Sequence, residues 1–163
     1  MDEPRSSKKS RRDRLIQDAR HDPYRPREKQ QEPAACAGCG AVLRNGRWQW
    51  LQDSAAPLTA HCPACRRIED GNPAGLVTLR GPFLDEHRVE VLALVRNVES
   101  REKANHPLKR IIEIREEPDR IEITTTDLSL ARNIGDSLRH AYAGELKYQY
   151  TKGADSLRVT WSR

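Results

Sequence analysis

Two short cysteine motifs decide the fold of this chain: CAGC at residues 36–39 and CPAC at residues 62–65. They contain all four cysteines: Cys36, Cys39, Cys62 and Cys65. Two CxxC turns let four thiolates converge on one tetrahedral zinc ion, with Zn–S bonds near ~2.3 Å. The 22 residues between the motifs slightly exceed the usual gap for this pattern. We predict that the four cysteines bind one zinc ion, and the alternative is a group of free thiols.

The segment between the motifs predicts a β-hairpin. AVLRNGRWQW at 41–50 places Asn45-Gly46, a strong tight-turn signal, between two strand-like runs. The two CxxC motifs and the hairpin between them together predict a zinc ribbon over residues 34–80. The ribbon is expected to end in a loop with a short strand at Leu76–Leu79. A four-thiolate site leaves no open position for water activation, so the expected zinc is structural. It replaces a hydrophobic core that so short a segment cannot build.

Residues 81–163 predict a small α+β domain. Apolar spacing favours a long helix from Phe83 to Asn105, then a hairpin with strands near 111–114 and 121–123. Asp127 is expected to cap a second helix that ends before Gly144. Two alternating strands follow, at 146–150 and 157–161. The predicted fold class is α+β, with a four-cysteine zinc ribbon, a long helix and a small antiparallel β-β-α-β-β domain.

Residues 1–33 are rich in charge, Ser, Gln and Pro, which predicts a disordered basic arm. The first 70 residues carry 14 basic and 10 acidic side chains, +4 of the net +5. Six basic residues lie close together in the arm: Arg5, Lys8, Lys9, Arg11, Arg12 and Arg14. Such a run suits phosphates, and a solvated tail is the alternative.

The composition, 36% hydrophobic and 33% charged, favours a soluble chain with part of its length outside a packed core. No stretch approaches the roughly 20 apolar residues that span a bilayer, and the amino terminus lacks the apolar segment of a signal peptide. We expect a cytoplasmic protein without a membrane partner. In a reducing compartment, CxxC pairs favour metal binding over disulfides.

Side chains around the cysteines are of the types that bind nucleic acids. Guanidinium groups hold phosphates and flat rings stack on bases. The candidate contacts near the motifs are Arg44, Arg47, Trp48, Arg66 and Arg67. Trp48 and Trp50 share one strand face, so packing against the following domain is a competing role for them. Arg47, Arg66 and Arg67 are the stronger candidates, because no packing argument requires them.

The five histidines do not predict an enzyme. No nucleophile motif, phosphate loop or carboxylate pair accompanies them, and no small-molecule substrate is expected. His61 directly precedes Cys62. It is a candidate to contact a metal ligand, and the alternative is that it replaces one cysteine as a ligand. We hypothesise that the stretch His106-Pro107-Leu108 positions other residues.

Several stretches together resemble a bacterial family of short zinc-ribbon proteins. The stretches are HDPYR at 21–25, EPAACAGCGAVLRNGRWQW at 32–50, CPACRR at 62–67, PAG at 73–75, LVRNVESREKANHPLKRI at 94–111 and ITTTDLSLAR at 123–132. More distantly, the order of elements resembles the amino-terminal half of the archaeal and eukaryotic adaptor that exports large ribosomal subunits. That likeness implies binding to the ribosome or RNA, with the four cysteines as metal ligands. The chain has fewer CxxC pairs than the adaptor and lacks its transport region, so the likeness does not imply export.

These observations predict a non-enzymatic RNA-binding protein that associates with the ribosome, through rRNA, in translation control or subunit maturation. A zinc ribbon that binds DNA or acts in transcription is the first alternative. A module that binds a protein partner is the second.

Overall fold

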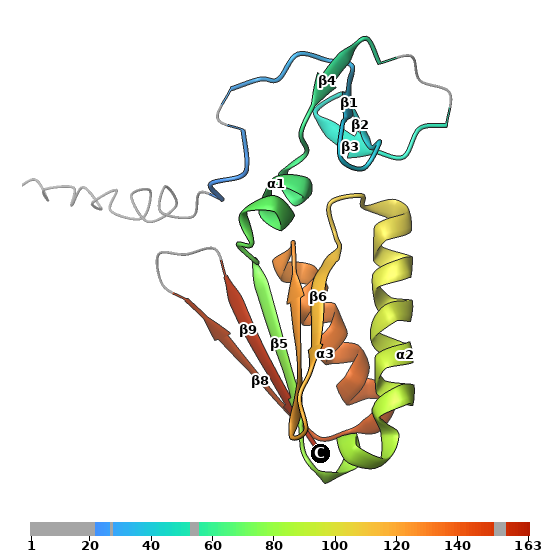
Figure 1. Ribbon diagram of the computed structural model, residues 1–163, viewed down its shortest axis with the longest axis vertical. Helices are drawn as coiled ribbons and strands as arrows, with labels where there is room; N and C mark the ends of the chain where they lie inside the picture. Colours follow the sequence, from blue (N-terminus) through green and yellow to red (C-terminus); the bar gives the residue numbers. More distant parts are fainter. Residues whose placement is uncertain (1–21, 27, 53–55, 152–155) are drawn as a thin grey trace, which may run out of the picture.

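The computed structural model describes residues 22–163, except residues 27, 53–55 and 152–155 (Figure 1). Its described residues form three helices and two mixed sheets, which confirms the α+β class. The smaller sheet has the strand order β3-β2-β1-β4, and the larger has the order β6-β7-β5-β9-β8.

Residues 34–70, which we call the cysteine unit, contain the smaller sheet and one helix. Their elements are β1 (Ala34–Cys36), β2 (Val42–Arg44), β3 (Arg47–Gln49), β4 (Leu58–Ala60) and α1 (Pro63–Asp70). The predicted hairpin is present as β2 and β3, paired antiparallel with Arg44 opposite Arg47. At its turn, Asn45 and Gly46 have φ of 54° and 72°, the left-handed conformation that favours these residue types. The outer strand β4 pairs parallel to β1.

Residues 75–163, which we call the sheet unit, contain the larger sheet and two helices. Their elements are β5 (Gly75–Arg80), α2 (Pro82–Asn105), β6 (Ile111–Glu116), β7 (Arg120–Thr125), α3 (Leu128–Tyr142), β8 (Glu145–Tyr150) and β9 (Leu157–Ser162). The predicted long helix, hairpin, second helix and two last strands are therefore all present. Asp127 caps α3 as expected, because its carboxylate accepts a hydrogen bond from the backbone N–H of Leu130.

The prediction of an antiparallel sheet was wrong. β5, expected as a short strand at the end of the ribbon, is the central strand of the larger sheet and pairs parallel to β9. It also pairs antiparallel to β7. The boundary predicted at residue 80 therefore follows a strand that belongs to the second sheet. Buried and partly buried residues alternate along β5, as expected for a central strand. This alternation does not specify which strands pair with β5.

Helices α2 and α3 lie on one side of the larger sheet (Figure 1). Between them and the strands lies the main core, in which Leu79, Ile123 and Trp161 are fully buried. α3 approaches the sheet closely at Gly135, where an added Cβ would lie 2.7 Å from the side chain of Val159. Small residues at this contact therefore fix the spacing between helix and sheet.

The cysteine unit lies over the end of the sheet unit at which α2 ends (Figure 1). Trp50, just after β3, donates a hydrogen bond from its indole Nε1 to the backbone oxygen of Lys103 in α2 (2.7 Å). Leu108, in the turn between α2 and β6, packs against the cysteines. The cysteines thus lie close to the junction of the two units.

The described part of the predicted disordered arm makes contacts with the cysteine unit. Tyr24 donates its hydroxyl to Asp70 of α1 (2.8 Å), and Asp22 accepts a hydrogen bond from Arg67 (2.6 Å). Glu32 accepts the backbone N–H of Gly46 in the hairpin turn (2.9 Å). Residues 1–21 lie outside the described residues, and with them the basic run: Arg5, Lys8, Lys9, Arg11, Arg12 and Arg14.

Candidate metal centre

The four cysteine sulfurs converge on one point. All four Sγ atoms lie within 4.8 Å of one another. The Sγ atoms of Cys36 and Cys65 are 3.7 Å apart, and those of Cys39 and Cys62 are 3.8 Å apart. A tetrahedral zinc with Zn–S bonds of ~2.3 Å requires sulfur–sulfur edges of about 3.8 Å. The sulfurs therefore have the spacing of a four-thiolate zinc site.

Glycine and backbone N–H groups shape the first motif. Gly38 lies so close to the second motif that a Cβ there would be 2.8 Å from the Sγ of Cys65. Gly40 follows with φ +78° and donates its N–H to the oxygen of Cys36 (2.8 Å). Burial raises the pKa of the Cys36 thiol, but backbone N–H donors, first that of Cys62, outweigh burial and lower it to about 6. Burial raises the pKa of Cys39.

The second motif forms the first turn of α1, where a loop had been predicted. Cys62 is the N-cap, and its Sγ accepts the backbone N–H of Cys65 (3.4 Å). Pro63 occupies the first turn, and Gly71 ends the helix in the left-handed conformation. Burial raises the pKa of Cys62, so metal binding has to displace its proton. The positive end of the helix dipole favours the resulting thiolate.

Arg110 reaches the site from the sheet unit. Its Nη2 lies 3.3 Å from the sulfurs of both Cys62 and Cys65, and the residue is 9% exposed. Burial lowers its pKa, but the hydrogen bond to Cys65 and the charge of Cys62 outweigh burial and raise it. Its Nε is buried without a partner among the described residues. The hydrogen bonds to the two sulfurs are therefore the main interactions that offset the cost of burying the charged guanidinium.

Thr126 holds Arg110 in place. Its hydroxyl accepts the N–H of Arg110 (2.9 Å) and donates to the backbone oxygen of Leu108 (2.6 Å). Its own N–H donates to the oxygen of Arg110 (2.9 Å). Four thiolates around a divalent ion would carry a net charge of −2, and the guanidinium reduces this to −1. Hydrogen bonds from residues beside metal ligands, such as these, orient the ligands and tune the affinity for the metal.

Apolar side chains close the site from water. Ala64 is buried beside the cysteines, and Trp48 and Leu108 pack against them half-buried. Trp48 thus packs against the cysteines but remains partly exposed, so packing and base stacking do not exclude each other. His61 is not in the cluster, because its Nδ1 lies 3.3 Å from the Glu69 carboxylate. With four protein ligands and this cover, the site can hold a metal but offers no position for a substrate.

The arginines predicted to bind nucleic acid differ in their surroundings. Arg44, Arg47 and Arg66 are exposed and form no ion pair within the described part of the chain. Arg67 is 5% exposed, pairs with Asp22 and stacks on the ring of Tyr24, with 4.4 Å from its Cζ to the ring centroid. It anchors the amino-terminal segment, so the expectation that Arg67 lacks a packing role was wrong.

We compared the chain with protein-family models, curated proteins and solved structures, and found no match. In the described ranges no helix has the length and apolar composition needed to cross a membrane.

Sequence reasoning missed two parts of the site. α1 had detectable signals: Pro63 in the first turn and Gly71 after the last turn are typical helix boundaries. Arg110 had no detectable signal in the sequence, because it lies 45 residues beyond Cys65 and reaches the site only through the tertiary fold. The neighbouring stretch 106–108 was predicted to position other residues, and Leu108 does pack on the cysteines.

Proposed function

We propose that this protein is a non-enzymatic zinc-ribbon protein that binds RNA and associates with the ribosome or a ribosomal subunit. In this account the zinc is structural. It holds the β2–β3 hairpin and α1 in the arrangement that presents their arginines to phosphates. Translation control or subunit maturation is the corresponding cellular role.

The observation that carries the proposal is the set of exposed arginines around the cysteines. Arg44 and Arg47 flank the hairpin turn, and Arg66 lies on α1 directly after Cys65. These three side chains have no acidic partner among the described residues. Arginines without an internal partner remain free to bind phosphates.

The sheet unit provides a contrast in charge pairing. Several of its arginines have carboxylate partners: Arg88 with Glu116 at 3.6 Å, Arg115 with Glu113 at 3.1 Å and Arg120 with Glu117 at 2.8 Å. Pairing of this kind reduces the attraction of a surface for phosphates. We therefore assign the main RNA contact to the cysteine unit and the amino-terminal arm.

Sucrose-gradient sedimentation of a cell lysate that contains the tagged protein tests the proposal. The expected result is migration with a ribosomal subunit, which RNase treatment abolishes and high salt weakens. DNase should leave the migration unchanged, and a loss with DNase alone would favour the DNA-binding alternative. Migration that survives both nucleases would favour a protein partner.

Charge-reversal variants locate the contact. R44E, R47E and R66E combined should move the protein to the light fractions. R158E is a matched control, because Arg158 is exposed on β9 of the sheet unit and lies outside the proposed contact. A triple variant that sediments like the wild type would contradict the proposed contact.

A further inference from the structure

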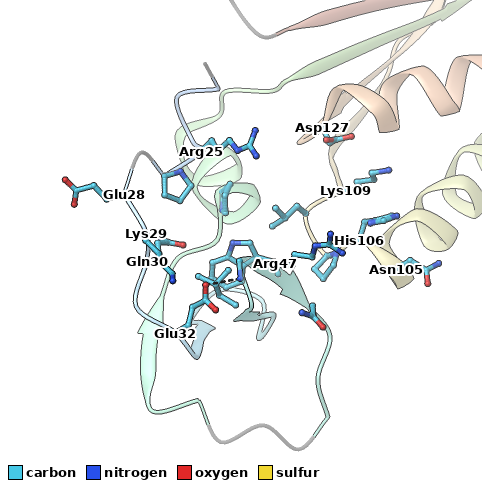
Figure 2. A pocket seen from close by; sticks show the side chains of 18 residues that line it. Arg25, Glu28, Lys29, Gln30, Glu32, Arg47, Asn105, His106, Lys109 and Asp127 are labelled. Carbon is cyan, nitrogen blue, oxygen red and sulfur yellow. Dashed lines mark hydrogen bonds between the residues drawn. The ribbon is translucent and has the colours of Figure 1, made fainter. Parts of the chain in front are cut away.

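A cleft of about 760 Å³ lies between three segments that are far apart in the sequence (Figure 2). Residues 25–26 and 28–32 form one wall, the β2–β3 hairpin forms the base, and the 105–109 turn after α2 forms the opposite wall. Ligand sites in proteins typically have volumes of about 300–1,000 Å³. The cleft is therefore large enough for a nucleotide unit of an RNA strand.

Contacts on both sides hold the walls in place. The amino-terminal wall is tied to α1 by the hydroxyl of Tyr24 and to the hairpin turn by Glu32. On the opposite wall, Lys109 pairs with Glu102 of α2 at 2.7 Å. The hairpin itself is joined to α2 by the Trp50 hydrogen bond. The cleft is thus a built feature of the fold, assembled from both units.

Three positive groups from two segments line the cleft. Arg25 and Lys29 come from the amino-terminal wall and Arg47 from the hairpin (Figure 2). All three are exposed and form no ion pair among the described residues. Of the three acidic side chains in the lining, Glu28 points away from the cleft in Figure 2, Glu32 accepts the hydrogen bond from Gly46, and Asp127 caps α3. The balance favours an anionic ligand.

The remaining lining is suited to a flat ring. Trp48, from the hairpin at the base, and His106, from the wall after α2, supply the aromatic surface beside Pro107 and Leu108. Stacking on aromatic side chains is how proteins bind unpaired bases without reading their sequence. A phosphate group beside a base is the combination that this lining would recognise.

We propose that this cleft binds single-stranded RNA, with Arg47 on a phosphate and a base stacked at His106 and Trp48. The inference rests on the proposed RNA-binding function and deepens it. It assigns the contact to an unpaired strand, because a duplex would not present a base to a cleft between two units. It also gives a role to His106, which is exposed and has no side-chain hydrogen bond among the described residues.

Fluorescence anisotropy with a labelled, single-stranded RNA oligonucleotide tests this site in the full-length protein. R47E and H106A should each weaken binding about fivefold or more. R158E and H140A are matched controls, since Arg158 and His140 are exposed on the sheet unit and absent from the cleft lining. Both controls should bind within twofold of the wild type. Photocrosslinking with 4-thiouridine should label residues of the cleft.

The outcomes separate this inference from the broader function. Wild-type binding with unchanged R47E and H106A affinities, or crosslinks confined to other surfaces, would overturn the cleft assignment alone. Equal affinity for duplex RNA, or competition by a polyglutamate peptide as strong as that by RNA, would also overturn it. A wild-type protein that neither binds the oligonucleotide nor sediments with ribosomes would overturn both proposals.

Discussion

The two units of this molecule bury very different interiors. The sheet unit packs large apolar side chains such as Leu79, Ile123 and Trp161 between five strands and two helices. Around the cysteines, the described residues form a small buried cluster of Ala64 and three of the cysteines, with the fourth cysteine, Trp48 and Leu108 at its edge. The other buried apolar side chains of the cysteine unit are few and mostly small: Ala34, Ala41, Val42 and Leu43. Hydrophobic burial can stabilise the first unit by itself, whereas the second needs a cross-link.

The comparison shows how one chain combines two sources of stability. Arg110 and Leu108 belong to the sheet unit by sequence but complete the surroundings of the cysteines. We therefore expect the cysteine unit to depend on a metal and on its neighbour. The sheet unit should depend on neither.

Metal removal is expected to have the largest effect. A chelator should unfold the cysteine unit and leave the sheet unit folded, because structural zinc contributes about 10–16 kcal/mol in small domains. The indole NMR signals of Trp48 and Trp50 should lose their dispersion, while that of the buried Trp161 should persist. Simultaneous loss of all three signals would show that the units do not differ in this way.

Truncation of the apolar core should have the next largest effect, on the other unit. Leu79→Ala removes a fully buried side chain and should lower the free energy of unfolding of the sheet unit by about 2–5 kcal/mol. Val89→Ala is the matched control, because Val89 is 82% exposed, and it should change stability by less than about 0.5 kcal/mol. Urea denaturation followed at the Trp161 indole measures both variants. Equal midpoints would contradict the assigned core.

Arg110 tests the junction of the units. Arg110→Met should lower the affinity for zinc about 10–100-fold, because it removes the donor to two thiolates. Arg110→Lys keeps the charge and should retain part of the affinity. Competition with a chromophoric chelator gives the affinities, and Arg115→Met serves as the control, since Arg115 is exposed on β6. Unchanged zinc affinity of the Arg110→Met variant would show that the guanidinium does not contribute to zinc binding.

The smallest effect concerns the carboxylate of Glu102, which holds the 106–110 turn through Lys109. The hydrogen bond from Lys109 lowers the pKa of Glu102 below its ordinary value of 4.5. The ion pair therefore stabilises the fold above pH 4.5, and its contribution disappears as the pH falls through the lowered pKa. Glu102→Gln should cost less than about 1 kcal/mol at pH 7 and progressively less at acid pH, as the pH falls through the lowered pKa. Thermal unfolding at pH 7 and at acid pH distinguishes this from a pH-independent loss of packing.

Local patterns in the sequence were sufficient for most elements of the fold. The 3.6-residue spacing of apolar side chains located α2 and α3, and Asp127 marked the start of α3. Asn45-Gly46 located the hairpin turn, and the two CxxC motifs identified the cysteine cluster. Each of these signals arises from residues within a few positions of one another, where backbone geometry limits the options.

Long-range contacts were not accessible to that reasoning. The parallel pairing of β5 with β9 joins strands separated by almost the whole sheet unit, and no local pattern encodes it. Arg67 was predicted to bind nucleic acid, and no local pattern singled out Arg110. Only the fold shows that Asp22 and Tyr24 bury the first and that two thiolates bury the second.

Native mass spectrometry of the purified protein, combined with alkylation of its thiols, tests the central claim most directly. We predict a mass with one zinc ion per chain and four cysteines that resist alkylation until a chelator is added. A folded, metal-free protein with all four cysteines alkylated and unchanged indole signals for Trp48 and Trp50 would contradict the structural role of the metal. It would also remove the basis on which the arginines of the cysteine unit are placed for RNA.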